Sequence, residues 1–201
     1  MIKNIVFDLN GVLYTHSPAS LKKATGSSIR KKAKLFEVLA SREWEEYNRG
    51  YYEDLDGFLT VYLSTRKGNR EEIREMLRIF NAESFPYDEE LMSFMEDHPE
   101  YDYYLLSNTV PDQAESFPKA RFYPLMKGIM VSFEERLLKP DPAFYTRFLE
   151  KYDLNAKECL FIDDNKKNTA IAEELGFHTI THKTGASTLR AIRKETETWK
   201  K

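Results

Sequence analysis

The sequence predicts an α/β fold: a parallel sheet flanked by helices, with a small all-helical segment inserted after the first strand. Two observations support this prediction. Short apolar, β-branched or aromatic runs, at residues 5–7, 103–106 and 160–162, are typical of strands that are buried on both faces. Segments with helical patterns separate these runs, and such an alternation implies parallel strands joined by right-handed crossovers.

The first strand is predicted over residues 3–8, and the segment that follows it contains only helical patterns. Apolar residues recur there at the i, i+3, i+4, i+7 spacing of an amphipathic helix. The two clearest sets are Leu55, Phe58, Leu59 and Tyr62, and Ile73, Met76, Leu77 and Phe80. We therefore expect residues 16–86 to form a helical cap, inserted into a core made of residues 1–15 and 87–201.

Strands and helices alternate in the remainder of the chain, with no internal repeat and no low-complexity linker. The predicted strands lie at residues 103–107, 128–132, 159–163 and 177–181. The predicted helices lie at residues 112–121, 141–152, 166–175 and 186–198. Together with the first strand, these elements give one covered parallel sheet.

Polar side chains follow three of the buried runs, at the point where each predicted strand ends, and a lysine lies in a loop between them. In chain order they are Asp8 and Asn10, Ser107 and Asn108, Lys139, and Asp163 and Asp164. In an open α/β sheet, ligands bind just beyond the carboxyl ends of the strands, so one crevice is expected to hold these groups. Three carboxylates, a hydroxyl and an ammonium suggest a divalent metal ion and a phosphate group.

Four segments resemble, in this order, motifs I to IV of the haloacid dehalogenase superfamily, whose members are mostly phosphatases and phosphotransferases. The segments are Phe7–Val12, Leu105–Asn108, Lys139–Pro142 and Phe161–Asn165. Each motif alone is a weak signal, but all four at strand ends are hard to obtain by accident. The resemblance covers the whole chain and implies a Rossmann-like core. It is closest to the branch with a small helical cap between motifs I and II, similar to phosphatases acting on glucose 1-phosphate.

The resemblance implies a catalytic role for several residues. Asp8 is the expected nucleophile, because a carboxylate at a buried strand end can attack phosphorus and form an acyl phosphate. Ser107 is expected to donate a hydrogen bond to the phosphoryl group, and Asn108 to add a second donor beside it. Lys139 is expected to bind the phosphate and to neutralise its charge. Taken singly, each has an ordinary structural alternative, such as a turn residue or a surface lysine.

A Mg²⁺ site is implied by the same resemblance. Asp164 would be a direct ligand and Asp163 a supporting residue, together with Asp8 and the backbone carbonyl of Asn10. These oxygen ligands suit Mg²⁺. Adjacent residues of a strand point to opposite faces, so Asp163 and Asp164 can serve one metal ion only if the strand has ended by Asp164.

Asn10 departs from the usual Asp-x-Asp form of motif I. In the family the second aspartate shuttles a proton to the leaving oxygen, and an amide cannot do so because it does not ionise near neutral pH. General acid–base catalysis contributes about 10²–10⁴-fold to a rate. The substitution therefore predicts a slower phosphatase or one that serves good leaving groups.

Three functions fit these residues. The first is a Mg²⁺-dependent phosphatase acting on a small phosphorylated metabolite, with a sugar phosphate as one possibility. The second is a dehalogenase-like hydrolase in which Asp8 attacks carbon; such enzymes need no metal, so the pair Asp163 and Asp164 argues against it. The third is a catalytically degenerate binding protein, against which stands the retention of Asp8, Ser107 and Lys139.

The cap is expected to select the substrate, although its sequence is less informative. Aromatic side chains crowd a short stretch beside an arginine: Trp44, Tyr47, Arg49, Tyr51 and Tyr52. They would either stack on a sugar and pair with an anion, or form the hydrophobic core of the cap itself, and we expect core for most of them.

Composition fits a cytoplasmic enzyme. The chain has 201 residues and a formal net charge of −3, which argues against general nucleic-acid binding. A strand pattern from residue 2 leaves no room for a signal peptide, and no apolar stretch approaches membrane length. Cys159 is the single cysteine and begins a strand that is expected to be buried, so packing is its expected role. The oligomeric state is not indicated.

Overall fold

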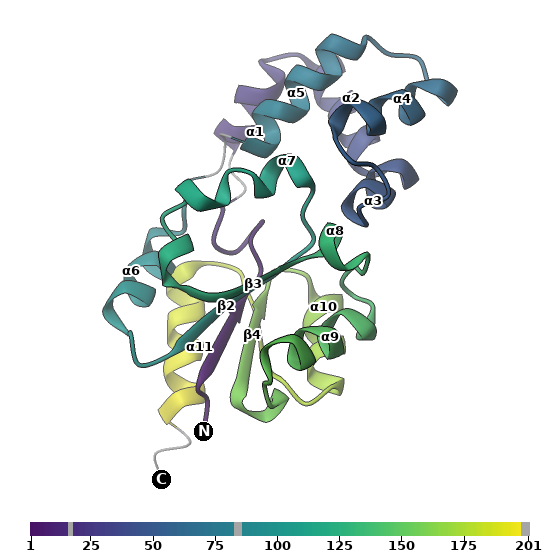
Figure 1. The fold of residues 1–201 in the computed structure, drawn as a ribbon. Helices are drawn as coiled ribbons and strands as arrows, with labels where there is room; N and C mark the ends of the chain where they lie inside the picture. The colour runs from purple at the N-terminus through teal and green to yellow at the C-terminus, as the bar shows by residue number, and fades with distance from the viewer. Residues whose placement is uncertain (16–17, 83–85, 198–201) are drawn as a thin grey trace.

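The computed structural model describes residues 1–15, 18–82 and 86–197, and Figure 1 shows their arrangement. Five parallel strands form one sheet in the order β3-β2-β1-β4-β5. The strands are β1 (Asn4–Phe7), β2 (Asp102–Ser107), β3 (Met126–Val131), β4 (Cys159–Asp163) and β5 (His178–Thr181). The predicted parallel α/β sheet is therefore confirmed.

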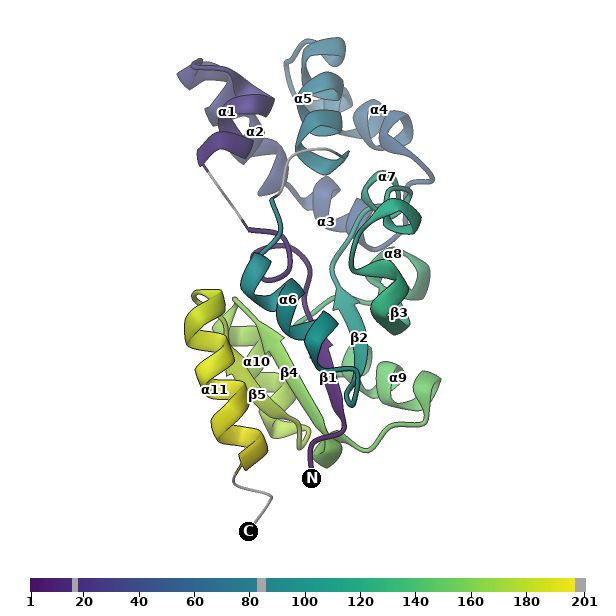
Figure 2. The same cartoon turned by 90° about the vertical axis from the view of Figure 1, so that its left-hand side faces the viewer.

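Helices cover both faces of this sheet (Figure 2). Successive strand residues point to opposite faces, so Ile5 and Phe7 belong to one hydrophobic cluster and Val6 to another. The first cluster includes α6 (Glu89–Asp97) and α11 (Gly185–Glu197), and the second includes α9 (Pro142–Tyr152) and α10 (Lys166–Glu174). Because both faces are covered, the strands read as continuous apolar runs rather than alternating ones.

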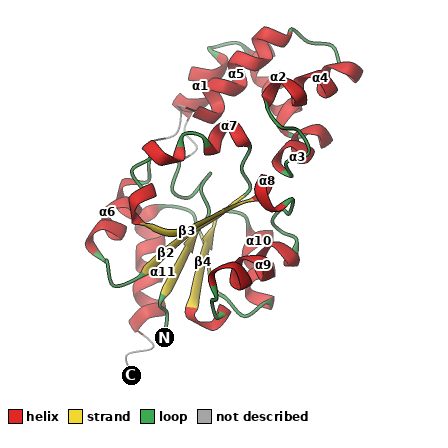
Figure 3. Cartoon of the chain, viewed as in Figure 1, coloured by secondary structure: helices red, strands yellow, loops and turns green. Residues whose placement is uncertain are grey.

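Five helices form a separate layer beyond the carboxyl ends of the strands, and Figure 3 shows red helices joined by green loops in the described part of this layer, with no yellow strand. They are α1 (Pro18–Thr25), α2 (Ile29–Leu39), α3 (Arg42–Asn48), α4 (Leu55–Thr65) and α5 (Arg70–Ala82). They share a hydrophobic cluster, to which Val110 of the remainder of the chain also belongs. We call this layer the cap. Its predicted limits at residues 16 and 86 stay a prediction, and residue 16 lies outside the described residues.

Side-chain caps explain where several cap helices begin. The hydroxyl of Ser28 accepts a hydrogen bond from the N–H of Lys31, and the hydroxyl of Ser41 accepts one from Trp44. The carboxylate of Asp54 accepts one from Gly57. Each bond satisfies an N–H group that has no partner within its own helix.

The prediction of a helix over residues 112–121 is wrong. The chain forms only the single turn α7 (Pro111–Ala114), followed by 3₁₀ turns at Phe117–Lys119 and Tyr123–Leu125. Pro118 has no N–H group to donate and its ring obstructs a continuing α-helix. Two further helices were not predicted, namely α6 and the one-turn α8 (Ser132–Glu135). The last helix ends at Glu197, and residue 198 of its predicted range lies outside the described residues.

Within the described part of the chain, no helix combines the length and the apolar character that crossing a bilayer requires.

Candidate active site

Two carboxylates leave the sheet at the same level, at the ends of β1 and β4. These strands pair in parallel with Phe7 opposite Ile162, and Asp8 and Asp163 directly follow these residues. The N–H of Asp8 donates to the carbonyl of Ile162 at 2.9 Å, which extends the ladder by one bond. Both Asp8 and Asp163 are buried. Strand register alone therefore brings together two side chains that are far apart in the sequence.

The ammonium group of Lys139 bridges the two carboxylates. Its Nζ lies 2.8 Å from Asp8 Oδ1 and 2.6 Å from Asp163 Oδ2, and the side chain is 1% exposed. Burial raises the pKa of Asp8 to about 6, although the Lys139 ammonium acts in the opposite direction. Burial also acts to lower the pKa of Lys139, but the carboxylates of Asp8 and Asp163 hold that pKa above its ordinary value. Lys139 is therefore a cation at neutral pH.

Asp163 and Asp164 have different surroundings although they are adjacent. Asp163 Oδ1 accepts hydrogen bonds from the N–H of Asn165 at 2.8 Å and from Asn168 Nδ2 at 3.0 Å, and its Oδ2 faces Lys139. Asp164 lies beyond the end of β4 and is exposed. This arrangement supports Asp164 as the direct metal ligand and Asp163 as the residue that supports the site.

The carboxylates form a cluster that fits a divalent cation. One ligand atom from each of Asp8, Asp163 and Asp164 lies within 4.8 Å of the others. One ammonium group, that of Lys139, contacts two of the three carboxylates. An all-oxygen donor set with excess negative charge is what Mg²⁺ prefers in proteins.

Gly11 allows the loop after β1 to pass close to this cluster. Its φ is +89°, a conformation that L side chains rarely adopt. A Cβ atom at this position would lie 2.4 Å from Asp164 Oδ2, well inside contact distance. The backbone conformation of residue 11 therefore favours glycine, and a side chain there would displace the Asp164 carboxylate.

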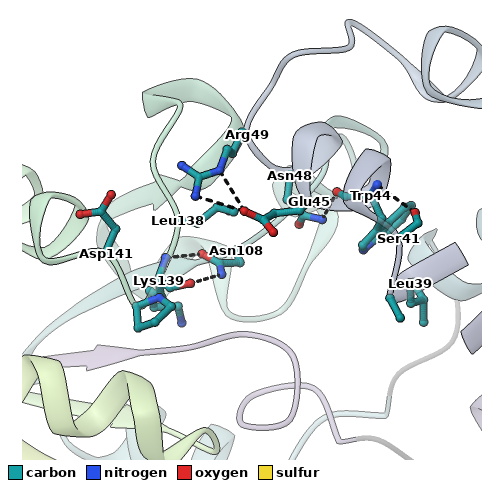
Figure 4. A pocket seen from close by; sticks show the side chains of 12 residues that line it. Leu39, Ser41, Trp44, Glu45, Asn48, Arg49, Asn108, Leu138, Lys139 and Asp141 are labelled. Carbon is teal, nitrogen blue, oxygen red and sulfur yellow. Dashed lines mark hydrogen bonds and ion pairs between the residues drawn. The ribbon is translucent and has the colours of Figure 1, made fainter. Parts of the chain in front are cut away.

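Ser107 and Asn108 lie at the end of β2, next to β1 in the sheet. Ser107 is fully buried, and its Oγ accepts a hydrogen bond from the hydroxyl of Thr109 at 2.9 Å. The side chain of Asn108 binds both backbone groups of Lys139: Nδ2 donates to the carbonyl and Oδ1 accepts from the N–H, each at 2.9 Å (Figure 4). Asn108 therefore positions the Lys139 loop, and its contact with a phosphate stays a prediction.

Asn10 makes a hydrogen-bonded pair with another amide. Its Nδ2 donates to Gln113 Oε1 at 3.1 Å, and Gln113 Nε2 donates to Asn10 Oδ1 at 2.9 Å. Gln113 lies on α7 and is buried. The amide of Asn10 is therefore fixed by a residue 103 positions away in the sequence.

A pocket of about 530 Å³ opens beside Lys139 between the cap and the remainder of the chain (Figure 4). Its apolar lining includes Leu39, Trp44 and Leu138. The polar lining includes the ion pair between Arg49 and Glu45, whose nearest atoms are 3.2 Å apart. A molecule in this pocket would be in contact with both apolar and polar groups.

The aromatic stretch at residues 44–52 contributes both to the core of the cap and to the lining of the pocket. Tyr47 belongs to the cap core, fully buried with its ring centroid 5.4 Å from that of Phe58. Tyr52 packs against the same cluster and Tyr51 is exposed. Trp44 both packs against the cluster and lines the pocket, and the neighbouring Arg49 also lines the pocket.

Three residues of the site were not predicted from the sequence: Thr109, Gln113 and Asn168. Each holds a predicted residue in place rather than lying at a strand end itself. Asn168 had a usable signal, because it lies on the first turn of the helix after Asp163 and can reach back to that carboxylate. Gln113 had no such signal in the sequence, because its partner Asn10 follows β1 and lies 103 positions away.

The fold and the site place the chain among α/β proteins that bind their ligands beyond the carboxyl edge of a parallel sheet. The family model of the haloacid dehalogenase-like hydrolases matches residues 2–176, and the chain belongs to this family of hydrolases.

Individual relatives are identical to this chain at about a quarter of the aligned residues. The sesquiterpene phosphatase astK of Aspergillus oryzae is 28% identical over 178 residues, which cover 87% of this chain and 86% of that protein. Drimenol cyclase drtB of Aspergillus calidoustus is 26% identical over 90% of this chain, which corresponds to 34% of that longer protein. The structure of a predicted HAD-like family hydrolase from Porphyromonas gingivalis matches 98% of both chains, with a TM-score of 0.74 and 26% identity.

Proposed function

We propose that the chain is a Mg²⁺-dependent phosphatase that acts on a small phosphorylated metabolite through an aspartyl-phosphate on Asp8. The observation that carries this proposal is the buried contact of Lys139 with Asp8 and Asp163, next to the exposed carboxylate of Asp164. A nucleophile, a fixed cation and a cluster of oxygen ligands are the groups that phosphoryl transfer requires.

The residues present divide the reaction between them. Asp8 forms the bond to phosphorus as the ester P–O bond breaks, and water then hydrolyses the acyl phosphate. Lys139 fixes the Asp8 carboxylate and offsets the charge of the phosphoryl oxygens. Ser107, whose hydroxyl is oriented by Thr109, donates to one of these oxygens.

The proposed metal ligands are Asp8, Asp164 and the backbone carbonyl of Asn10, with Asp163 in support. When bound, Mg²⁺ would supply positive charge that screens the repulsion between the Asp8 carboxylate and the phosphate. The buried contacts of Asp163 keep the cluster in place.

The pocket of Figure 4 is the proposed site for the alcohol part of the substrate. Two classes of alcohol are supported. The resemblance to sugar-phosphate phosphatases favours a sugar, and the relative astK favours a sesquiterpene alcohol. The mixed apolar and polar lining, which includes Trp44, Leu138, Arg49 and Glu45, accommodates either class. We therefore propose both classes for the first substrate panel.

The test is phosphate release from sugar phosphates, an aryl phosphate and a sesquiterpenyl monophosphate, with Mg²⁺ or with EDTA. Asp8→Asn is the blank. Asp97→Asn is the matched control, because it makes the same chemical change on an exposed residue at the end of α6. We expect Mg²⁺-dependent release by the wild type and by Asp97→Asn, and none above background by Asp8→Asn.

The absence of release above the Asp8→Asn blank across the panel would contradict the proposal. One observation favours the degenerate binding protein as the second candidate, namely Asn10 in place of an acid. That candidate predicts binding of phosphate or of a panel compound without turnover. The dehalogenase-like alternative predicts halide release from a 2-haloacid that does not depend on Mg²⁺.

A further inference from the structure

The hydrogen-bonded pair of Asn10 and Gln113 uses both the nitrogen donor and the oxygen acceptor of the Asn10 amide. Two reciprocal hydrogen bonds of 3.1 and 2.9 Å satisfy one donor and one acceptor of each side chain. A carboxylate at position 10 would have no hydrogen to donate, so it would lose one bond and place two oxygens against each other. Gln113 is 4% exposed, and burial makes an unpaired amide costly.

The element that carries Gln113 also contacts the cap. On α7, Asp112 accepts a hydrogen bond from the hydroxyl of Tyr47 in the cap core. Val110, which precedes the helix, lies within the hydrophobic cluster of the cap. The helical turn α7, which carries Gln113, is thus held by two contacts with the cap.

We propose that Gln113 is a positioning residue for Asn10, which it holds as a fixed amide donor facing the oxygen that leaves phosphorus. The inference rests on the proposed phosphatase function. Gln113 accepts one N–H of Asn10 Nδ2. An amide nitrogen carries two N–H groups, so the second is the one that we assign to the leaving oxygen. A donor of this kind stabilises charge on the oxygen but transfers no proton to it.

The proposed step is balanced without an acid. The Asp8 carboxylate forms its bond to phosphorus while the ester P–O bond breaks, and the electron pair leaves with the ester oxygen. That oxygen accepts the Asn10 hydrogen bond and afterwards takes its proton from water. The site therefore selects phosphate esters whose leaving oxygen is a weak base, such as aryl, enol or hemiacetal phosphates, over those of simple alkanols.

Kinetics with Gln113→Met test the proposal, because methionine keeps the approximate shape and removes both hydrogen bonds. We expect kcat to fall about tenfold to a hundredfold, the scale of misplacing a reacting group, with KM unchanged. The loss should be larger for alkyl phosphates than for nitrophenyl phosphate. In an Asn10→Ala background, Gln113→Met should cause no further loss of kcat. Glu115→Ala, an exposed position just after α7, is the matched control.

A second readout does not depend on activity. Asn10 precedes Gly11, and deamidation requires the Gly11 nitrogen to attack the side-chain carbonyl of Asn10, with loss of ammonia and ring opening by water. In the structure the Gly11 N–H donates to the carbonyl of Tyr14 at 2.7 Å, and the Asn10 amide is held by Gln113. We expect peptide mass analysis to show slow one-dalton gain at Asn10 in the wild type and in Glu115→Ala, and severalfold faster gain in Gln113→Met.

The two readouts separate this inference from the proposed function. If the wild type releases no phosphate, the proposed function fails, and the deamidation rates still decide whether Gln113 holds Asn10. Equal deamidation rates in the wild type and Gln113→Met would overturn the positioning role. An equal loss of kcat from Gln113→Met with Asn10 present or absent would overturn it as well, because Gln113 would then act independently of Asn10.

Discussion

Asp8 is the residue in which the requirements of chemistry and of stability conflict most. Its carboxylate is buried beside a second buried carboxylate, Asp163, and one ammonium contacts both. Burial raises its pKa to about 6, so at neutral pH the folded chain holds a carboxylate whose ionisation costs more free energy there than it would in water. Under the proposed function, a bound cation would offset this cost, which the metal-free protein bears in full.

The sign of the resulting pH dependence follows from the raised pKa. The folded protein binds the Asp8 proton more tightly than the unfolded chain, whose pKa is near 3.8. The contribution of Asp8 to stability is therefore present at low pH and is lost as the pH rises through about 6. In EDTA, we expect Asp8→Asn to be more stable than the wild type by about 1–3 kcal/mol at about pH 8, and the difference to disappear near pH 4.

Denaturant unfolding of both proteins at the two pH values measures this difference. The substitution leaves Lys139 paired with Asp163 at 2.6 Å, so no buried ammonium is left without a partner. An Asp8→Asn protein that is no more stable than the wild type at the higher pH would contradict the prediction.

At the scale of elements, α3 connects the cap to the one-turn helices α7 and α8. Its residue Tyr47 bonds to Asp112 of α7, and Gly50 just after the helix packs against α8. A Cβ atom on Gly50 would lie 2.2 Å from the carbonyl oxygen of Phe133, and its φ is +70°. The cap can approach α8 this closely only because residue 50 has no side chain.

We expect Gly50→Ala to displace the cap from α8 and to raise KM at least severalfold, because the pocket lies between α3 and the Lys139 loop. Gly26→Ala is the matched control: its φ of +59° imposes a similar backbone strain of about 1 kcal/mol, but the methyl group it adds would meet nothing within 4 Å. Steady-state kinetics and thermal unfolding of both variants measure the two effects separately. A KM for Gly50→Ala equal to that of Gly26→Ala would show that the close packing does not shape the pocket.

At the scale of the whole molecule, the proposed metal site lies at the carboxyl edge of the sheet and outside the cap. Its three carboxylates lie at the ends of β1 and β4, and the cap supplies none of them. Binding of a cation to the folded protein should therefore stabilise the sheet and everything packed on it. A ligand at 100 times its dissociation constant stabilises a protein by about 2.7 kcal/mol.

Mg²⁺ should accordingly raise the melting temperature by about 5–10 °C for a protein of this size. Asp164→Asn should largely lose this shift, because the exposed carboxylate is the proposed direct ligand. Thermal unfolding with MgCl₂, and with NaCl at matched ionic strength, measures the specific effect. Equal shifts with the two salts, or a full shift in Asp164→Asn, would contradict the proposed ligand.

The strands of the sheet could be predicted from the sequence, because a strand buried on both faces is an apolar run bounded by polar residues. The proximity of Asp8 and Asp163 could be predicted because parallel strands end at a common edge, whereas Lys139 reaches them from a loop and was expected there from the resemblance. Gln113 could not be predicted, since its role comes from a three-dimensional contact with Asn10 that no local pattern announces. The helix predicted over residues 112–121 was wrong because Pro118 lacks an N–H group and obstructs a continuing α-helix, so only a single turn forms before it.

Residue 1 and the described end of α11 both lie at the amino edge of the sheet. Figure 1 shows the start of β1 and the end of α11 on the side away from the cap. Met1 is 65% exposed, and Glu197 is the last described residue of α11. A tether, an affinity tag or a second folded unit joined at either of these points would lie on the side of the sheet opposite the cap. Immobilised in this way, the protein would turn its pocket toward the bulk solution and stay open to diffusing molecules.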